Sequence, residues 1–266
     1  MVALIRSDAA SRPTAPNKIA VLADPVFSEK DPRVRRVKTA GKNPKQGGSP
    51  GSTGKDVVLR SAVESGAAGR DGFMERLPYS RKEADAIASL VSKDNAMVAM
   101  DFNANKSTAT DPRLGDFRYV HFATHSLLNS MHPELSGLVF SLVDANGSEQ
   151  DGFLQAHEVY NLKLPVDMVV LSACNTGLGK EISGEGIVGI TRGFMYAGAS
   201  RVLVSQWRVA DDATAELMAR MYSGILGPKK LRPLAALREA QISMCKDKRW
   251  TFPYYWAGFV MQGEWR

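Results

Sequence analysis

Short apolar runs bounded by turn-forming residues recur along the chain, and amphipathic stretches separate several of them. The apolar runs predict β-strands over residues 18–23, 117–124, 137–143, 167–172 and 201–205. Apolar positions spaced three and four residues apart predict helices over residues 80–91, 186–197, 211–225 and 233–245. In the first of these helices Ser80 stands three residues before Glu83, which is the spacing of a capping box.

Strands that alternate with helices predict an α/β fold in which a mostly parallel sheet is covered on both faces. In such sheets, active sites gather at the carboxyl ends of the strands. This rule directs attention to the residues that follow the predicted strands.

A basic, low-complexity stretch interrupts the pattern between residues 28 and 72. It holds ten Lys and Arg residues against five Asp and Glu, so it carries +5 of the formal net charge of +6. Its Gly, Ser and Pro content predicts a disordered insertion. Because the charge is confined to this segment, without interleaved aromatic residues, we do not expect nucleic acid as a partner.

The chain contains two cysteines, Cys174 and Cys245, which do not make a disulfide framework. No apolar run approaches the roughly 18–20 residues that span a bilayer. The apolar stretch at the N-terminus is too short for a secretory signal. The sequence therefore predicts a cytoplasmic protein with free thiols. Cys245 lies near the end of a predicted helix, and we expect it to pack in the interior.

Two reactive residues follow predicted strands. His125 comes directly after the strand that ends at residue 124, and Cys174 comes two residues after the strand that ends at residue 172. Because neighbouring parallel strands lie about 4.8 Å apart, side chains at adjacent carboxyl ends come within reach of each other. A nearby imidazole raises the thiolate fraction of a thiol, or takes its proton during attack. The pair is a candidate dyad, with Cys174 as nucleophile and His125 as base.

The residues after Cys174, from Asn175 to Gly179, form a glycine-containing turn whose backbone N–H groups can face a bound carbonyl oxygen. A structural interpretation stays open. A lone Cys at the end of an apolar strand is most often a small buried side chain, and a lone His is most often a hydrogen-bonded structural residue. The pattern by itself does not decide between the two.

Several ordered segments resemble the CHAT domain, a family of caspase relatives found beside tetratricopeptide repeats. The segments are ADPVF at 23–27, VHFATH at 120–125, VVLSACNTG at 169–177, SQWRV at 205–209 and PYYWAGF at 253–259. The resemblance runs from about residue 18 to the C-terminus and is interrupted mainly by the basic insertion at about 28–72. It implies one domain over residues 18–266, preceded by residues 1–17 as a tail or a remnant of an upstream segment.

This resemblance implies a caspase-haemoglobinase-like three-layer sandwich and a cysteine endopeptidase whose dyad falls on His125 and Cys174. It implies a protein or peptide substrate, with neither cofactor nor metal. It also implies regulation by a partner or an upstream segment, such as a tetratricopeptide-repeat protein. The backbone N–H groups of Ser126 and Cys174 are the expected oxyanion donors. The family usually has Gly where this chain has Ser126, so a Cβ stands beside the expected substrate position.

A basic substrate side chain is a further implication of the resemblance. The related separases place an acidic residue shortly after a motif like that at 205–209, which makes Asp211 a candidate for binding substrate Arg or Lys. Trp207 is a candidate for lining the same cleft. Asp211 equally fits a cap on the helix that follows it, and Trp207 equally fits the core.

Three alternatives compete with the peptidase interpretation. Gly184 to Gly189 spell GxGxxG, but the first glycine lies twelve residues after Ser172, so we expect helix packing rather than nucleotide binding. His121 and His125 are four residues apart, but on a strand that spacing separates them by about 13 Å, too far to share zinc. We expect His121 to be structural. The third alternative is a catalytically inactive CHAT-fold scaffold for interaction or signalling.

Overall fold

The computed structural model describes residues 13–35, 58, 62–63, 74–128, 136–176 and 185–265. Of residues 128, 173–176 and 185–188 it describes the backbone only. Most of the basic insertion therefore lies outside the described residues, and the division into tail, domain and insertion stays a prediction. None of the described helices is both long and apolar enough to cross a lipid bilayer.

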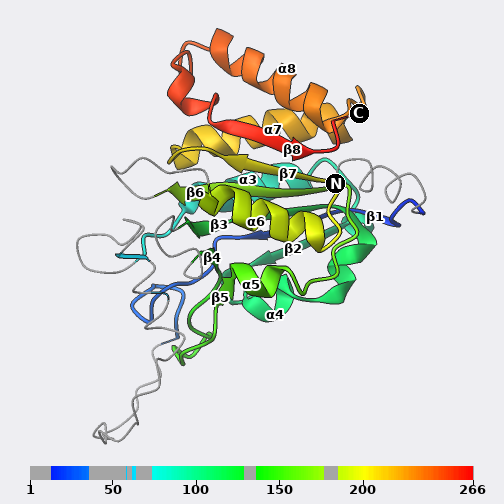
Figure 1. The fold of residues 1–266 in the computed structure, drawn as a ribbon. Helices are drawn as coiled ribbons and strands as arrows, with labels where there is room; N and C mark the ends of the chain where they lie inside the picture. The colour runs from blue at the N-terminus through cyan, green and yellow to red at the C-terminus, as the bar shows by residue number, and fades with distance from the viewer. Residues whose placement is uncertain are drawn as a thin grey trace, which may run out of the picture.

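Eight strands in the described part of the chain form one sheet (Figure 1). They are β1 (Asn17–Ala23), β2 (Ala96–Met100), β3 (Phe117–Leu128), β4 (Gly137–Val139), β5 (Phe153–Gln155), β6 (Met168–Thr176), β7 (Arg201–Ser205) and β8 (Phe259–Gly263). Six of them follow the order β2-β1-β3-β6-β7-β8, in which all neighbours are parallel except β7 and β8. β4 pairs antiparallel with β3 and with β5. The predicted mostly parallel central sheet is confirmed.

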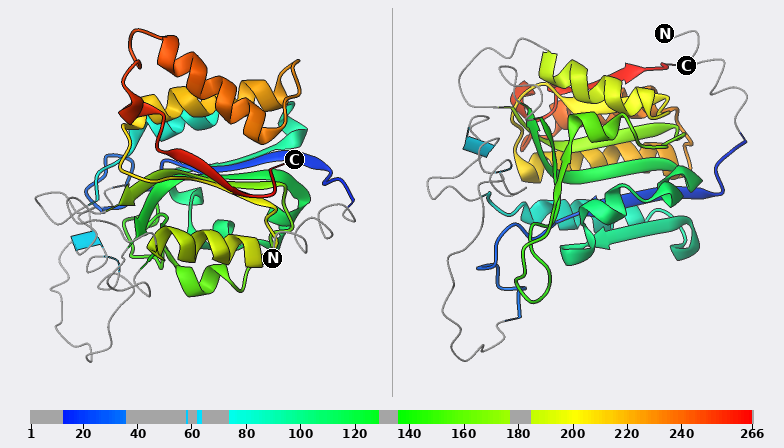
Figure 2. Two further views of the ribbon diagram at one scale, coloured as in Figure 1. Left: turned by 45° about the horizontal axis from the view of Figure 1, so that its top comes forward. Right: turned by 60° about the horizontal axis from the view of Figure 1, so that its bottom comes forward.

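Helices lie on both faces of this sheet, so the molecule has three layers (Figure 2). The α-helices are α3 (Pro78–Ala88), α4 (Lys106–Ala109), α5 (Ala156–Val159), α6 (Glu185–Tyr196), α7 (Asp211–Leu226) and α8 (Pro233–Lys246). Short 3₁₀ turns lie at Lys93–Asn95, Asp101–Asn103, Pro112–Asp116 and Pro253–Tyr255. One face carries α3, α7 and α8, and the other carries α5 and α6.

The alternation of side chains along β3 shows why its sequence is apolar on both faces. Val120 and Phe122 pack in the cluster on the α5 and α6 side, whereas Tyr119 and Ala123 pack in the cluster on the α3 and α7 side. Successive residues of a strand point to opposite faces, so a strand buried on both faces is apolar at nearly every position.

The predicted strands that carry the candidate dyad are longer than expected. β3 continues to Leu128 and β6 continues to Thr176, so His125 and Cys174 lie within strands rather than after them. A register shift between Phe122 and His125 separates the two halves of the β3–β6 pairing. Beyond that shift the strands carry polar residues, which is why the apolar pattern ended too early.

The predicted capping box at Ser80 is wrong. The helix begins at Pro78 after Leu77, and no side chain caps it through Leu77. Ser80 lies in the first turn, where its Oγ accepts a hydrogen bond from the backbone N–H of Asp24 at 3.0 Å. Glu83 points into the core instead of back to the helix terminus. A long-range partner thus replaces the local contact that the spacing predicted.

Two further expectations are corrected. Cys245 is exposed on α8, not packed in the interior. Gly189 does not serve tight helix packing, because a Cβ there would meet no described atom within 4 Å. Gly184, the first glycine of the GxGxxG motif, lies outside the described residues.

Candidate functional site

The two residues of the predicted dyad stand on adjacent strands in the middle of the sheet. β3 and β6 are parallel neighbours, and the register pairs His125 with Ala173 and Ser126 with Cys174. The backbones of His125 and Cys174 are therefore one ladder position apart at the carboxyl ends of the strands. The side chain of Cys174 lies outside the part of the chain that the structure describes.

The imidazole of His125 is held by a backbone group from a distant segment. His125 is 4% exposed, and its ring lies 5.1 Å from the ring of Phe27 between centroids. Its Nε2 lies 2.7 Å from the carbonyl oxygen of Glu75. Because a carbonyl oxygen can only accept, Nε2 carries the hydrogen. The tautomer of His125 is thus set by the segment that precedes α3.

The surroundings of His125 favour the neutral ring. Burial lowers the pKa of His125 from 6.5 to about 4, an effect that the hydrogen bond to Glu75 opposes and the charge of Arg208 reinforces. Burial disfavours the charged form of a base because the low-dielectric interior solvates it poorly. At neutral pH, His125 is therefore an uncharged imidazole with its hydrogen on Nε2.

Ser126 occupies an interior position in the sheet. It lies between Leu138 of β4 and Cys174 of β6 in the two ladders. Its side chain is fully buried, and its Oγ has no hydrogen-bond partner among the described residues. A serine in this place therefore brings a buried hydroxyl next to the backbone of the candidate nucleophile.

Asp211 stands at the start of α7 but caps a different helix. Its Oδ2 accepts a hydrogen bond from the backbone N–H of Tyr79 in the first turn of α3, at 2.8 Å. Burial and then the nearby carboxylates of Glu83, Asp212 and Asp24 together raise the pKa of Asp211 to about 6, against the opposing effect of the Tyr79 bond. His125 and Asp211 therefore hold opposite ends of the segment that runs from Glu75 to Tyr79.

Trp207 packs against the C-terminal part of the chain. Its Nε1 donates a hydrogen bond to the carbonyl oxygen of Tyr254 at 3.0 Å. A Cβ on Gly258 would lie only 2.8 Å from Cε2 of the indole, so the ring sits directly on that glycine. The neighbouring Arg208 is exposed, and its charge acts on His125. The loop after β7 therefore lies at the His125 side of the sheet.

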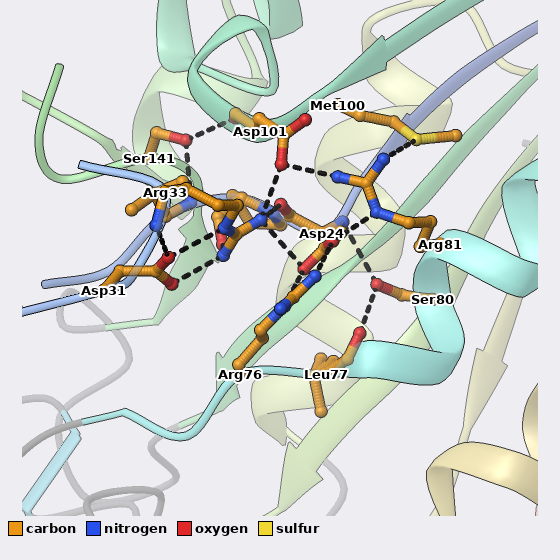
Figure 3. A network of polar contacts seen from close by, with 12 residues as sticks. Asp24, Asp31, Arg33, Arg76, Leu77, Ser80, Arg81, Met100, Asp101 and Ser141 are labelled. Carbon is orange, nitrogen blue, oxygen red and sulfur yellow. Dashed lines mark hydrogen bonds and ion pairs between the residues drawn. The ribbon is translucent and has the colours of Figure 1, made fainter. Parts of the chain in front are cut away.

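Sequence reasoning missed a charged cluster that stands beside His125. Asp24 follows β1 directly and is fully buried, and Asp101 follows β2 directly. Arg33, Arg76 and Arg81 converge on these two carboxylates (Figure 3). For Asp24 the available signal was its position directly after the strand predicted at 18–23, the same rule that singled out His125. Asp101 follows a strand that the sequence did not predict.

Comparisons with known proteins agree with the motifs. A family model described as "CHAT domain" matches residues 2–264. Tetratricopeptide repeat protein 28 of human is 37% identical over 115 residues, which is 43% of this chain. The mouse protein of the same name is 36% identical over 111 residues, or 42% of this chain. The matched region covers 4% of each relative, so this chain corresponds to a small part of those proteins.

Proposed function

Because this chain belongs to the CHAT domain family, which is related to the caspase-like peptidases, we propose that it is a cysteine endopeptidase that hydrolyses peptide bonds in a protein substrate. The observation that carries the proposal is the setting of His125. His125 lies on the strand next to the one that carries Cys174, and its Nε2–H is held by the backbone carbonyl of Glu75.

This tautomer defines the chemistry of the dyad. With hydrogen on Nε2, the nitrogen that takes the proton of the Cys174 thiol is Nδ1. The sulfur attacks the carbonyl carbon of the scissile bond, and the N–H groups of Ser126 and Cys174 donate to the oxyanion. The imidazolium then returns the proton to the leaving amine, and water hydrolyses the thioester in a second, equivalent step.

The low pKa of His125 decides when the proton moves. An ordinary thiol has a pKa near 8.5, well above the value of about 4 to which burial brings His125. The thiol therefore keeps its proton in the resting enzyme and gives it to His125 only during attack. We propose general-base catalysis rather than a preformed thiolate–imidazolium pair.

We propose that the substrate presents a basic side chain near the scissile bond, with Asp211 as its acceptor and Trp207 beside it. Asp211 Oδ2 is bound to Tyr79, and a carboxylate has further acceptor sites on its two oxygens. We also propose regulation by tetratricopeptide repeats in the same or another chain, a proposal supported by the names of the two relatives.

The dyad is tested by labelling with an electrophilic peptide probe. All proteins carry Cys245→Ser, because Cys245 is exposed and would react unselectively. We expect labelling to vanish in Cys174→Ala and to slow by roughly 10²–10⁴-fold in His125→Ala. His157→Ala is the matched control, because His157 is exposed on α5, and its labelling rate should equal that of the parent protein.

A folded parent protein that is not labelled selectively at Cys174 contradicts the peptidase proposal. That outcome favours the second candidate function, an inactive CHAT-fold scaffold for interaction or signalling. The buried Ser126 at the position where the family usually has Gly is the observation on its side. Labelling that Cys174→Ala leaves unchanged would place the reactive thiol elsewhere and contradict the assigned nucleophile.

A further inference from the structure

We infer that Arg76 and Asp24 are positioning residues for His125: their ion pair fixes the backbone carbonyl that holds the histidine Nε2–H. The inference rests on the proposed function only in giving His125 a catalytic role. Whether the salt bridge controls the tautomer of the His125 ring can be tested whether or not His125 is catalytic.

The link between the ion pair and the histidine is one peptide unit. The carbonyl that accepts from His125 Nε2 at 2.7 Å belongs to Glu75, and the same planar peptide group contains the nitrogen of Arg76. A rotation of this unit would turn the carbonyl away from the imidazole. Whatever holds Arg76 therefore also holds the acceptor of His125.

Arg76 is held by a two-point contact. Its Nε donates to Oδ1 of Asp24 at 2.8 Å, and its Nη2 donates to Oδ2 at 2.7 Å. Paired, charge-assisted bonds between guanidinium and carboxylate define orientation as well as distance. The Arg76 side chain is 39% exposed, while Asp24 is fully buried, so the arginine reaches from the surface onto an interior anchor.

The anchor is itself immobilised from several elements (Figure 3). Arg81 of α3 donates from Nε to Asp24 Oδ2 at 2.8 Å, and Arg33 Nη1 lies 3.1 Å from Oδ1. The backbone N–H of Asp24 donates to Ser80 Oγ at 3.0 Å. The arginines also bridge Asp24 to Asp101 at the end of the next strand. Asp24 thus cannot shift without breaking contacts to α3 and to Arg33.

The segment that carries the carbonyl is fixed on both sides of Arg76. On one side Met74 packs in the apolar cluster that contains Leu127, two residues beyond His125 on β3. On the other side α3 begins at Pro78, and Tyr79 is bound to Asp211. Among the described residues between Met74 and Pro78, only Arg76 makes an ion pair. We therefore take this contact to set the orientation of the peptide group.

The cluster contains equal numbers of carboxylates and guanidinium groups, so loss of the Arg76 charge alters the segment that positions the Glu75 carbonyl. Three carboxylates, from Asp24, Asp31 and Asp101, face the three guanidinium groups of Arg33, Arg76 and Arg81. Removal of the Arg76 charge leaves one carboxylate in excess, next to the segment that must hold its carbonyl toward His125. The buried Asp24 keeps its bonds to the other two arginines, so the cluster itself can survive that change.

The experiment measures the tautomer of His125 directly. In protein with nitrogen-15 histidine, the chemical shifts of the two ring nitrogens report which one carries the hydrogen, and His125→Gln assigns the signals. We expect Nε2–H to dominate in the wild type. In Arg76→Gln the ratio of Nε2–H to Nδ1–H should fall by roughly tenfold, which corresponds to the net free energy of one hydrogen bond. Arg76→Lys, which keeps the charge but not the two-point contact, should lie between them.

Arg113→Gln is the matched control. It removes a two-point Arg–Asp contact, to Asp111, from an 82% exposed side chain in the turn before β3, at the other end of the strand from His125. Its His125 tautomer ratio should equal that of the wild type. A folded Arg76→Gln protein with the wild-type ratio overturns the inference. If Arg76→Gln fails to fold, Arg76→Lys decides: a lowered ratio supports the inference and an unchanged ratio overturns it.

The probe-labelling rate separates this inference from the proposed function. A shifted tautomer in Arg76→Gln together with no labelling of the wild type would support the positioning role and contradict the peptidase. Labelling of the wild type with an unchanged tautomer and rate in Arg76→Gln would support the peptidase and contradict the positioning role.

Discussion

Two histidines four residues apart on β3 have different kinds of partner. His121 is fully buried between α3 and α7, with Nε2 at 2.6 Å from Glu83 Oε1 and Nδ1 at 3.2 Å from the Tyr222 hydroxyl. His125, beyond the register shift, is held through Nε2 by the backbone carbonyl of Glu75. One ring is bound by side chains of two helices, and the other by a main-chain group of a connecting segment.

The difference shows what makes a histidine structural or chemically useful. Both nitrogens of His121 are bound within a side-chain network in the core, so neither is available to a substrate. A backbone carbonyl neither gives nor takes a proton, so it fixes the tautomer of His125 and confines any change of protonation to Nδ1. The sequence prediction that His121 is structural agrees with these contacts.

The largest expected effect is the loss of stability when His121 is removed. His121→Leu leaves the buried Glu83 carboxylate without its imidazole, and an uncompensated buried charge typically costs about 3–5 kcal/mol. His125→Leu removes one hydrogen bond to a carbonyl and should cost about 1 kcal/mol. Urea denaturation of the two variants measures both free energies of unfolding.

A double variant checks the cause. Glu83→Leu combined with His121→Leu removes the unpaired charge together with its partner, so it should be more stable than His121→Leu alone. Equal costs for His121→Leu and His125→Leu, or no recovery in the double variant, would break the distinction between the two histidines.

The second prediction concerns the titration of His125. Burial lowers its folded-state pKa from 6.5 to about 4. The neutral ring therefore contributes stability that is fully present above pH 6.5 and is lost as the pH falls through about 4. The total is on the order of 3 kcal/mol. In His125→Gln the acid limb of the stability curve should be shallower by a similar amount.

Proton NMR of the His125 ring supplies the direct measurement. Its signals should stay constant from neutral pH down to about pH 5 and move only near pH 4, the value to which burial lowers the pKa. The exposed His157 provides an internal comparison in the same spectrum. A His125 midpoint near 6.5 would mean that the ring is solvated, and it would contradict a pKa lowered by burial.

Much of the sheet was predictable, because burial on both faces leaves a continuous apolar run. The strand predicted at 201–205 matches β7, and the helices predicted at 211–225 and 233–245 match α7 and α8 within one residue. β2, β5 and β8 were not predicted. β2 is a short edge strand with Val98 exposed, although all five of its residues are apolar. β5 has only three residues, and β8 pairs on one side only and ends in Gln262 and Gly263.

The candidate site was predictable in part. His125 could be found from its place after an apolar run, but Glu75 and Arg76 could not. They lie 50 and 49 residues from His125 in sequence, and they act through a backbone carbonyl that carries no residue-type signal. The ion pair of Arg76 with Asp24 spans 52 residues, across the basic insertion. Contacts of that kind follow from the folded topology rather than from local spacing.

The third prediction sharpens the account of His121 through Tyr222. Tyr222→Phe removes the hydroxyl bound to Nδ1 while keeping the ring, and the lost buried hydrogen bond should cost about 1 kcal/mol. Tyr160→Phe is the matched control, because the hydroxyl of Tyr160 bonds to the carbonyl of Gly189 at the surface and water can replace it. Equal urea midpoints for the two variants would show that the bond to Tyr222 contributes nothing to the network.

The last prediction concerns Asp211, and we expect the smallest effect there because Asp211 is only partly buried and solvent screens its charge. Burial and then the carboxylates of Glu83, Asp212 and Asp24 raise the pKa of Asp211 to about 6, against the bond from Tyr79. The folded state therefore binds the proton more tightly than the unfolded chain, and stability falls as the pH rises from about 4 through 6. Asp211→Asn keeps an acceptor for the Tyr79 N–H without the charge. It should be more stable than wild type at pH 8 and equal to it near pH 4.

Urea midpoints at the two pH values test this expectation, with Asp94→Asn on the exposed 3₁₀ turn as the control that should not change. If Asp211→Asn is instead less stable at pH 8, the carboxylate has a favourable charge partner, and the raised pKa of Asp211 is contradicted. Capture of basic and neutral peptide probes by the same variant then separates the two roles of Asp211. A cap on α3 affects both probes equally, whereas an acceptor for substrate Arg or Lys affects only the basic one.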